Sequence, residues 1–362
     1  MIYYNNGKLN HLTNLFKMKG SVFRFAFIVA FPCSVLSLLA KFLVKEGYMR
    51  WLDWDEDHMI LLNNAPWNGF TFLVGFLIVF RTSQSYSRFW DACTCTAEMR
   101  AQWYDGASAL VAFCRHSQAD EECVRRFKHL IVRLFSMLHA AALAEVEDKT
   151  SKDTQGLRLN LIDPDGIDAK TLCSLQPLEC KVGMIFQWIQ VVIVDNIKTG
   201  VLNIPPPILS RVFQQVGNGM VALHDAIKIS TVPFPFPYAQ TCDLLLVMHW
   251  MTTPVIIQSW TSSLGWAGIF SFIMVFTYWS LNSIAVELEN PFGADANDLD
   301  FSEMQTDLNR HLLILLTPSA GQPPALSNTC NYFCCDDMHS MQEQLTKRSF
   351  LDVWGDIKVK TF

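Results

Sequence analysis

The sequence predicts an all-α membrane protein with four membrane segments per subunit and a cytosolic helical bundle. Of its 362 residues, 51% are hydrophobic and 17% are charged, whereas an ordinary soluble domain carries about 25% charged residues. Long apolar runs concentrate in two regions, residues 22–80 and 238–286. Between these regions, apolar positions recur at the spacing of amphipathic helices. These three observations favour bilayer-crossing helices on either side of a helical domain in water.

The first predicted span covers residues 22–44, which is long enough to cross a bilayer. Its charged residues, Arg24 and Lys41, lie near the two ends, where long side chains can reach the membrane interface. Lysines precede the span, whereas the loop after it is mainly acidic. The positive-inside rule therefore predicts that the N-terminal segment, residues 1–21, lies in the cytoplasm.

The second apolar run, residues 66–80, is short and continues into a polar helical pattern through Arg81 and Arg88. We expect one helix that leaves the bilayer without stopping, which suits the lining of a pore. Pro66 favours a helix start, with Asn64 nearby as a cap. Several such N-termini around one axis would favour anions at the outer mouth. An ordinary capped helix explains the same residues equally well.

Three phenylalanines in this run, Phe72, Phe76 and Phe80, lie four residues apart and therefore form one narrow stripe on a helix. One interpretation is that the stripe packs against a neighbouring helix. The other is that it forms a hydrophobic constriction, in which bulky apolar side chains gate a pore by excluding water.

Residues 81–237 are predicted to form a bundle of long cytosolic helices, interrupted by proline-containing turns such as 163–166 and 205–207. Two further membrane segments, 244–264 and 265–286, follow almost without a break and predict a tight hairpin. We accordingly divide the chain into residues 1–21, 22–80, 81–237, 238–286, 287–320 and a C-terminal tail, 321–362.

Two sequence regions resemble the signature regions of bestrophins. One is Phe80 to Ala92, Phe-Arg-Thr-Ser-Gln-Ser-Tyr-Ser-Arg-Phe-Trp-Asp-Ala, and the other is Glu289-Asn290-Pro291-Phe292-Gly293 followed by Asp298-Leu299. The resemblance covers about residues 8–316. It implies a homopentamer in a lipid bilayer, with one central pore that conducts small anions such as chloride, and also bicarbonate or nitrate. Phe72, Phe76 and Phe80 match the three hydrophobic residues of the family's pore neck.

The resemblance also implies a second constriction at the cytoplasmic end of the pore. The matching stretch is residues 205–208, and within it we expect Pro207 or Ile208 to form the aperture. A helix breaker between two bundle helices is an alternative explanation of these prolines.

The acidic loop after the last span, residues 290–300, matches the calcium clasp of animal bestrophins. The resemblance implies a Ca²⁺ site with side-chain ligands Asp295 and Asp298 and with main-chain carbonyl ligands at Glu287 and Asn290. Hard cations such as Ca²⁺ prefer oxygen ligands. Alanines stand where the animal cluster has acidic residues, and the alternative is a loop whose aspartates cap the helix that starts near residue 302.

Other function classes find less support. The sequence contains no metalloprotease, phosphate-binding or serine-hydrolase motif, which argues against an enzyme. The net charge of −6 without a basic block argues against nucleic acid as a partner. The eleven cysteines show no regular spacing and are expected to be reduced thiols.

Three questions stay open at this point. A cation-permeable bestrophin homologue and a non-conducting membrane scaffold are alternatives to the anion channel, although Arg81 and Arg88 favour anions along the second helix. The membrane is the plasma membrane or, in a photosynthetic organism, the thylakoid, and the mixture of motifs suggests an alga or protist. A fused or associated sensor domain fits the resemblance, but no segment of this chain resembles one.

Overall fold

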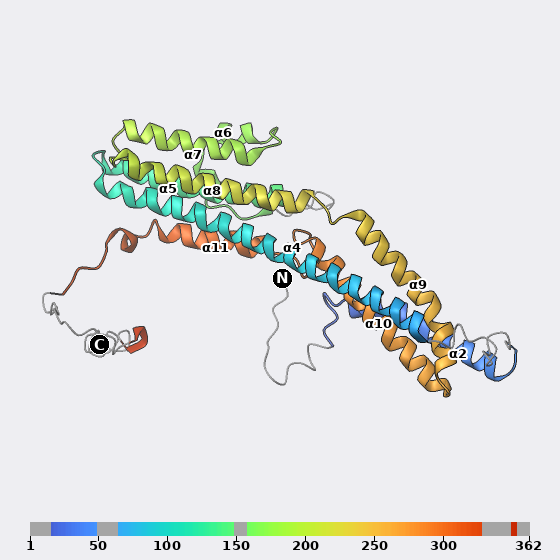
Figure 1. Cartoon of the computed structure of the whole chain (residues 1–362). Coiled ribbons are helices and arrows are strands. Elements are labelled where there is room, and N and C mark those ends of the chain that lie inside the picture. Colours follow the sequence, from blue (N-terminus) through green and yellow to red (C-terminus); the bar gives the residue numbers. More distant parts are fainter. Residues whose placement is uncertain (1–15, 49–63, 148–157, 328–348, 353–362) are drawn as a thin grey trace. The chain divides into compact units, whose positions relative to one another are not determined.

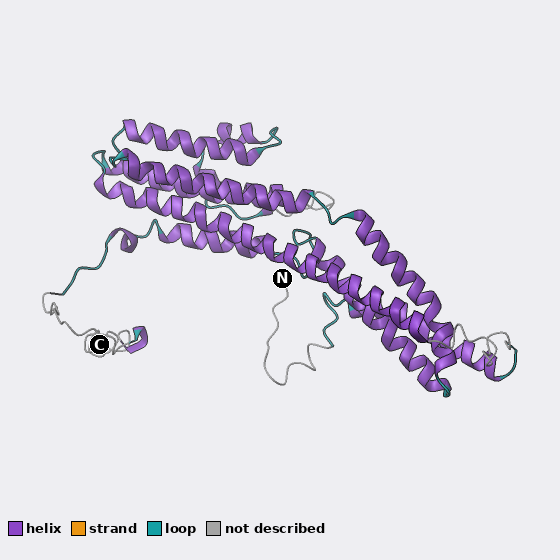
Figure 2. Ribbon diagram, in the orientation of Figure 1, coloured by secondary structure: helices purple, strands orange, loops and turns teal. Residues whose placement is uncertain are grey.

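The computed structural model describes residues 16–48, 64–147, 158–327 and 349–352, and the regular elements within these ranges are helices (Figures 1 and 2). The chain divides into two compact units, residues 1–317 and 318–362. The second unit contributes a 3₁₀ turn, η5 (Pro318–Gly321). All the sites discussed below lie in the first unit.

The longest helix, α4 (Asn64–Phe113), runs for 50 residues without interruption. At 1.5 Å per residue it is about 75 Å long, so one element connects the predicted membrane region with the predicted cytosolic bundle. Its first part packs on α9 and α10, and its later part packs on α5, α8 and α11. The expected continuation of the second apolar run into a polar helix is therefore confirmed.

Four helical segments make up what we call the span group: α2 (Phe23–Lys45), α4 up to Phe80, α9 (Phe236–Trp260) and α10 (Leu264–Glu289). Small polar residues bring α2 and α10 together. The Ser37 hydroxyl donates to the Ser271 hydroxyl at 2.6 Å, and the Ser34 hydroxyl donates to the Gly268 carbonyl at 2.9 Å. Short side chains of this kind let membrane helices approach closely.

The remaining elements form the bundle around the later part of α4. They are η2 (Cys114–His116), α5 (Glu121–Val146), η4 (Pro164–Gly166), α6 (Ala169–Leu175), α7 (Lys181–Lys198), α8 (Pro206–Thr231) and α11 (Phe301–Ile314). In Figure 1, α5, α8 and α11 lie along this part of α4, and α7 lies farther out, where it packs on α5.

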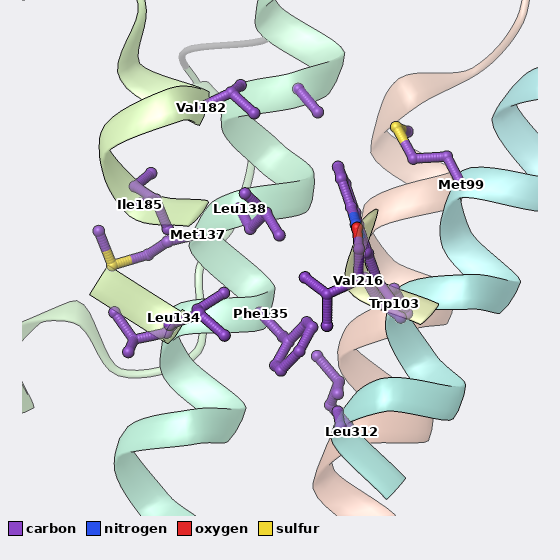
Figure 3. Close-up of a cluster of buried hydrophobic side chains, with 14 of the residues drawn as sticks. Met99, Trp103, Leu134, Phe135, Met137, Leu138, Val182, Ile185, Val216 and Leu312 are labelled. Carbon is purple, nitrogen blue, oxygen red and sulfur yellow. The ribbon is translucent and has the colours of Figure 1, made fainter. Parts of the chain in front are cut away.

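The bundle core forms where α4, α5, α8 and α11 meet (Figure 3). Trp103 and Phe135 are fully buried there, and Val216 and Leu312 pack beside them. The Trp103 indole N–H donates to the Val216 carbonyl at 3.2 Å, so its polar atom is satisfied inside the apolar core. This core fixes α4 against α8 and thereby fixes the direction in which α4 leaves the bundle.

By length and composition alone, three of the described helices could cross a membrane: α2, α5 and α10. Helix α5, however, buries 67% of its most apolar window inside the protein, and its apolar residues belong to the bundle core. Its hydrophobicity is explained by burial in protein. The apolar part of α4 and helix α9 do not meet the same criteria, so the total of four membrane segments stays a prediction.

Local boundaries follow the turn residues of the sequence. Helix α8 begins at Pro206, inside the expected interruption at residues 205–207, and α9 begins at Phe236, inside the proline-rich run. Helix α9 is longer than the predicted segment 244–264 because it begins eight residues earlier. The expected hairpin turn lies between Trp260 and Leu264.

Candidate functional site

The phenylalanine stripe lies on the face of α4 that points away from the rest of the protomer. Phe72, Phe76 and Phe80 are 74%, 59% and 45% exposed, whereas Val74 and Ile78 on the opposite face are buried. Phe80 contacts the Tyr238 ring of α9, with ring centroids 5.7 Å apart. Apart from this contact, the stripe is not a packing surface within one chain, and it is available to other subunits or to the solvent of a pore.

An aromatic cluster holds the opposite face of α4 and so sets the rotation of the stripe. The rings of Trp67 and His249 stack with centroids 5.2 Å apart, and Tyr278 meets His249 edge-on at 4.9 Å. The Tyr278 hydroxyl also donates to the Thr71 carbonyl at 3.1 Å. Because this face of α4 packs on α9 and α10, the rotation of the helix is fixed, and Phe72 and Phe76 point outward.

A buried charge network lies immediately beyond the stripe. Arg81 is 3% exposed, and its Nε and Nη2 donate to the two carboxylate oxygens of Glu289 at 2.7 and 3.2 Å. Its Nη1 donates to Asn282 at 2.9 Å and to Asp243 at 3.3 Å. One guanidinium thus ties α4 to both α9 and α10. A bidentate pair of this kind is strong and geometrically specific.

The structure corrects the expectation that Arg81 and Arg88 supply positive charge along the pore helix. Arg81 is paired with Glu289 on the buried side of α4. The Arg88 guanidinium donates to the main-chain carbonyls of Glu289, at 2.8 Å, and of Ile229. Both side chains hold the ends of other helices, so neither contributes a free cation to the phenylalanine face.

The two candidate aperture residues lie in the first turn of α8, at the start of the bundle helix that follows Pro205. Ile208 is 51% exposed, and Pro207 is exposed beside it. Leu209, the next residue, is buried in the bundle core. The position of this segment is compatible with both interpretations. As a break between bundle helices it begins α8, and as an aperture it presents an apolar side chain outward.

The acidic loop between α10 and α11 folds onto its own main chain. Asp298 is only 5% exposed, and its Oδ2 accepts a hydrogen bond from the Asp295 N–H at 2.7 Å. Glu287 accepts from the Asn297 amide at 3.0 Å. Asp300 is the N-cap of α11 and accepts from the Glu303 N–H at 3.0 Å. The capping role expected for an aspartate of this loop therefore belongs to Asp300.

The same loop borders a cavity of about 620 Å³ that is lined by Asp295, Asp298 and Asp300 and by Lys17 and Lys19. The pKa of Asp298 is raised to about 6, mainly by burial and in addition by the nearby carboxylates of Asp295 and Glu287, while the hydrogen bond from the Asp295 N–H opposes the shift.

A bound cation would relieve this crowding of negative charge. In the described part of the chain, however, no three His, Cys, Asp or Glu side chains lie close enough together to hold a metal ion. Asn290, the fourth predicted ligand, lies just past the last residue of α10. The charge of the loop fits a cation, but its described ligand geometry does not form a cage.

Sequence reasoning missed the Arg81 network because its members are far apart along the chain. Arg81 and Glu289 are 208 residues apart, and no spacing rule connects them. The signal available was the position of Arg81, one residue after Phe80, since a step of 100° on a helix moves a side chain off the stripe.

Comparisons with known proteins show the family and the fold of this chain. A family model described as "Bacterial/Fungal Bestrophin protein" matches residues 3–313. A voltage-dependent anion channel-forming protein of Nostoc sp. is 23% identical over 308 residues, covering 84% of this chain and 92% of the relative. A protein of the same description from Synechocystis sp. is 27% identical over 257 residues, covering 68% and 76% of the two chains.

Among solved structures, a bacterial bestrophin homologue from Klebsiella pneumoniae superposes with a TM-score of 0.62 at 18% identity. The match covers 83% of this chain and 99% of that one. At this identity the likeness shows a shared fold.

Proposed function

Because the chain belongs to the bestrophin family, we propose that it forms a homopentameric channel that conducts chloride and other small monovalent anions. The exposed stripe of Phe72, Phe76 and Phe80 carries this proposal. In a ring of five subunits with this face turned inward, each phenylalanine position becomes one apolar constriction. Such a constriction blocks ions when it expels water and conducts when it widens enough to stay wet.

Anion preference in this proposal comes from the helix N-termini at the outer mouth. Helix α4 begins at Asn64, two turns before Phe72, and its dipole contributes partial positive charge at that end. Five such ends around one axis would concentrate anions before the apolar neck. Bicarbonate and nitrate carry the same charge as chloride and would meet the same electrostatic preference.

The reversal potential under a chloride gradient, measured with purified protein in planar bilayers, tests the proposal. A reversal near the chloride equilibrium potential is the expected result. Absence of current under every voltage and calcium condition would contradict conduction and favour a scaffold role. Mass photometry of the same preparation tests the pentamer separately from the current.

A cation-permeable channel is a second candidate because Arg81 and Arg88 are both engaged with other helices. The neck then has no fixed cation on its phenylalanine face. Reversal near the cation equilibrium potential in the same experiment would favour this candidate over the anion channel.

We further propose that Ca²⁺ binds the acidic loop, with Asp298 and Asp295 as side-chain ligands and Glu287 and Asn290 contributing carbonyl oxygens. The carboxylates of Asp295 and Glu287 support this assignment. They contribute to the raised pKa of Asp298, although burial contributes more, and a bound cation would offset their repulsion. If Ca²⁺ binds, it should raise the melting temperature of the wild type and not that of Asp298→Asn. An equal response of both proteins, or none, would contradict the site.

For the second constriction we propose Ile208, with Pro207 holding the helix start. Ile208 is the exposed apolar residue of this turn, and a ring of five would narrow the pore where α8 begins. Ile208→Ala should change the permeability ratio of nitrate to chloride while leaving the voltage dependence of the neck unchanged. An equal nitrate-to-chloride permeability ratio in the wild type and in Ile208→Ala would contradict the aperture and leave this turn only its role as a helix start.

A further inference from the structure

Two grooves meet at Arg24, at the start of α2. The first has a volume of about 520 Å³, is nearly all apolar, and lies between α2 and α10. The second has a volume of about 690 Å³ and is bordered by polar groups of α9 and α10, among them Asp243, Ser283 and Glu287. Arg24 and Met18 line both grooves, so the two hollows adjoin at these residues.

Aromatic rings from two helices form the walls of the apolar groove. Phe23 lies 5.6 Å from Phe276 between ring centroids, and Phe27 lies 5.5 Å from Phe272 in an edge-to-face contact. These pairs hold α2 and α10 together while leaving Phe23 and Phe27 exposed at their outer edges. The result is a preformed groove lined by aromatic rings, which suits a flexible hydrocarbon chain.

The groove faces away from the proposed pore. Helix α4 packs on α9 and α10, and α2 packs on α9 and α10 in turn. Phe72 and Phe76 of the phenylalanine stripe point away from α9 and α10, so the exposed edge of α2 lies on the other side of these helices. In a ring of subunits with the stripe inward, this edge borders the lipid.

The charges around Arg24 define the headgroup that would fit. Arg24 forms no ion pair with any residue in the described ranges, and a guanidinium binds phosphate with paired hydrogen bonds. Asp243, whose side chain is 61% exposed, and Glu287 supply carboxylates on the other border of the same groove. Each already accepts a hydrogen bond, from Arg81 and Asn297 respectively, and each retains further lone pairs.

We propose that this site binds an aminophospholipid of the phosphatidylethanolamine class. Its phosphate lies on Arg24, its ammonium faces Asp243 and Glu287, and one acyl chain follows the ring-lined groove between α2 and α10. The positive-inside pattern places the site in the cytoplasmic leaflet. A choline headgroup carries no N–H donor for the carboxylates, and a glycerol headgroup carries no positive charge. The proposal rests on the proposed ring of subunits, which turns this surface to the lipid, but not on whether the pore conducts.

Native mass spectrometry of the full-length protein tests the site, with phosphatidylethanolamine, phosphatidylcholine and phosphatidylglycerol supplied at equal concentration. We expect preferential retention of phosphatidylethanolamine by the wild type. Arg24→Gln should lower that retention by about fivefold, the ratio expected for one basic residue beside a lipid phosphate, and Arg24→Lys should keep part of it. Lys45→Gln, at the opposite end of α2, is the matched control and should retain the lipid as the wild type does.

A second variant separates the chain groove from the headgroup contacts. Ile28→Trp should fill the apolar groove without changing any charge, and it should lower retention of all three lipids alike. Equal retention of the three lipids by the wild type, preference for phosphatidylglycerol, or unchanged retention in either Arg24→Gln or Ile28→Trp would overturn the proposal.

Discussion

Arg81 and Phe80 are neighbours in the sequence, yet they belong to different faces of α4. Phe80 is half-exposed, whereas Arg81 is buried against Glu289. Arg88, two turns later, holds the Glu289 carbonyl. Glu289 is also the last residue of α10 before the acidic loop. The end of the phenylalanine stripe and the start of that loop are therefore held by the same two arginines.

Replacing Glu289 with glutamine should destabilise the span group. The change leaves the buried Arg81 guanidinium with only Asp243 as a charged partner, and breaking a buried pair costs about 3 kcal/mol or more. We expect a lower melting temperature of the detergent-solubilised protein. Asp307→Asn is the control, since Asp307 forms more exposed pairs with Arg100 and Arg310, each worth about 1 kcal/mol or less. Equal effects of the two substitutions would refute a special role for Glu289.

A second prediction concerns His139 in the bundle. Its Nδ1 lies 2.6 Å from Gln305 Oε1, which joins α5 to α11. The pKa of His139 is lowered from 6.5 to about 4, mainly by burial and to a smaller extent by Arg100, while the hydrogen bond to Gln305 opposes the shift. The folded protein therefore holds the neutral ring, whereas the unfolded chain takes up a proton below pH 6.5.

The contribution of His139 to the free energy of unfolding should thus be fully present above about pH 6.5. It should decline as the pH falls toward 4, by at most about 3 kcal/mol. Melting curves between pH 7.5 and 5 check this. His139→Gln should flatten the profile because it removes the titrating ring. Parallel profiles of the two proteins would show that other groups dominate.

At the scale of elements, helical period and turn residues predict most of the architecture. The polar pattern after Phe80 predicts the continuous helix α4, and the proline runs predict the starts of α8 and α9. Helix α5 shows the limit of this reasoning. Its most apolar stretch is long and apolar enough to cross a membrane, and its burial among α4, α7, α8 and α11 shows that it belongs to the bundle.

The crossing of α4 and α8 gives a prediction that separates packing from helix propensity. A Cβ atom at Gly219 would overlap the Trp103 indole, so Gly219→Ala should destabilise the bundle by about 1–3 kcal/mol. Gly217, two residues earlier on α8, has no atom within 4 Å of such a Cβ. Gly217→Ala should be neutral or stabilising by up to about 1 kcal/mol, as helix propensity predicts. Similar melting temperatures for the two variants would argue against close contact at Gly219.

At the scale of the whole molecule, the sequence locates the candidate sites but not their internal contacts. Local spacing was sufficient for the stripe of Phe72, Phe76 and Phe80, because its members lie on one helix. It was insufficient for the Arg81 network and for the polar groove at Arg24, since each combines α9 and α10 with a helix far away in the chain. For the acidic loop, sequence supplied the carboxylates, while the fold determined that Asp298 is buried and that Asp300 caps α11.

The assembled channel gives the last prediction, the triple substitution of Phe72, Phe76 and Phe80 by alanine. These side chains are exposed in the protomer, so each substitution should change protomer stability by only about 0.5 kcal/mol. In a pentamer the same substitutions would remove three apolar rings and widen the neck, because alanine is too small to exclude water there. The open probability in planar bilayers should rise while the melting temperature stays near that of the wild type.

Phe270→Ala is the matched control for the triple variant, because Phe270 is similarly exposed but lies on α10, away from the stripe. It should leave the open probability unchanged. A triple variant that melts early without altered gating would show that the stripe packs between subunits. Unchanged melting together with raised open probability assigns the three phenylalanines to the gate, because an exposed side chain can affect conduction without affecting folding only where it borders the permeation path.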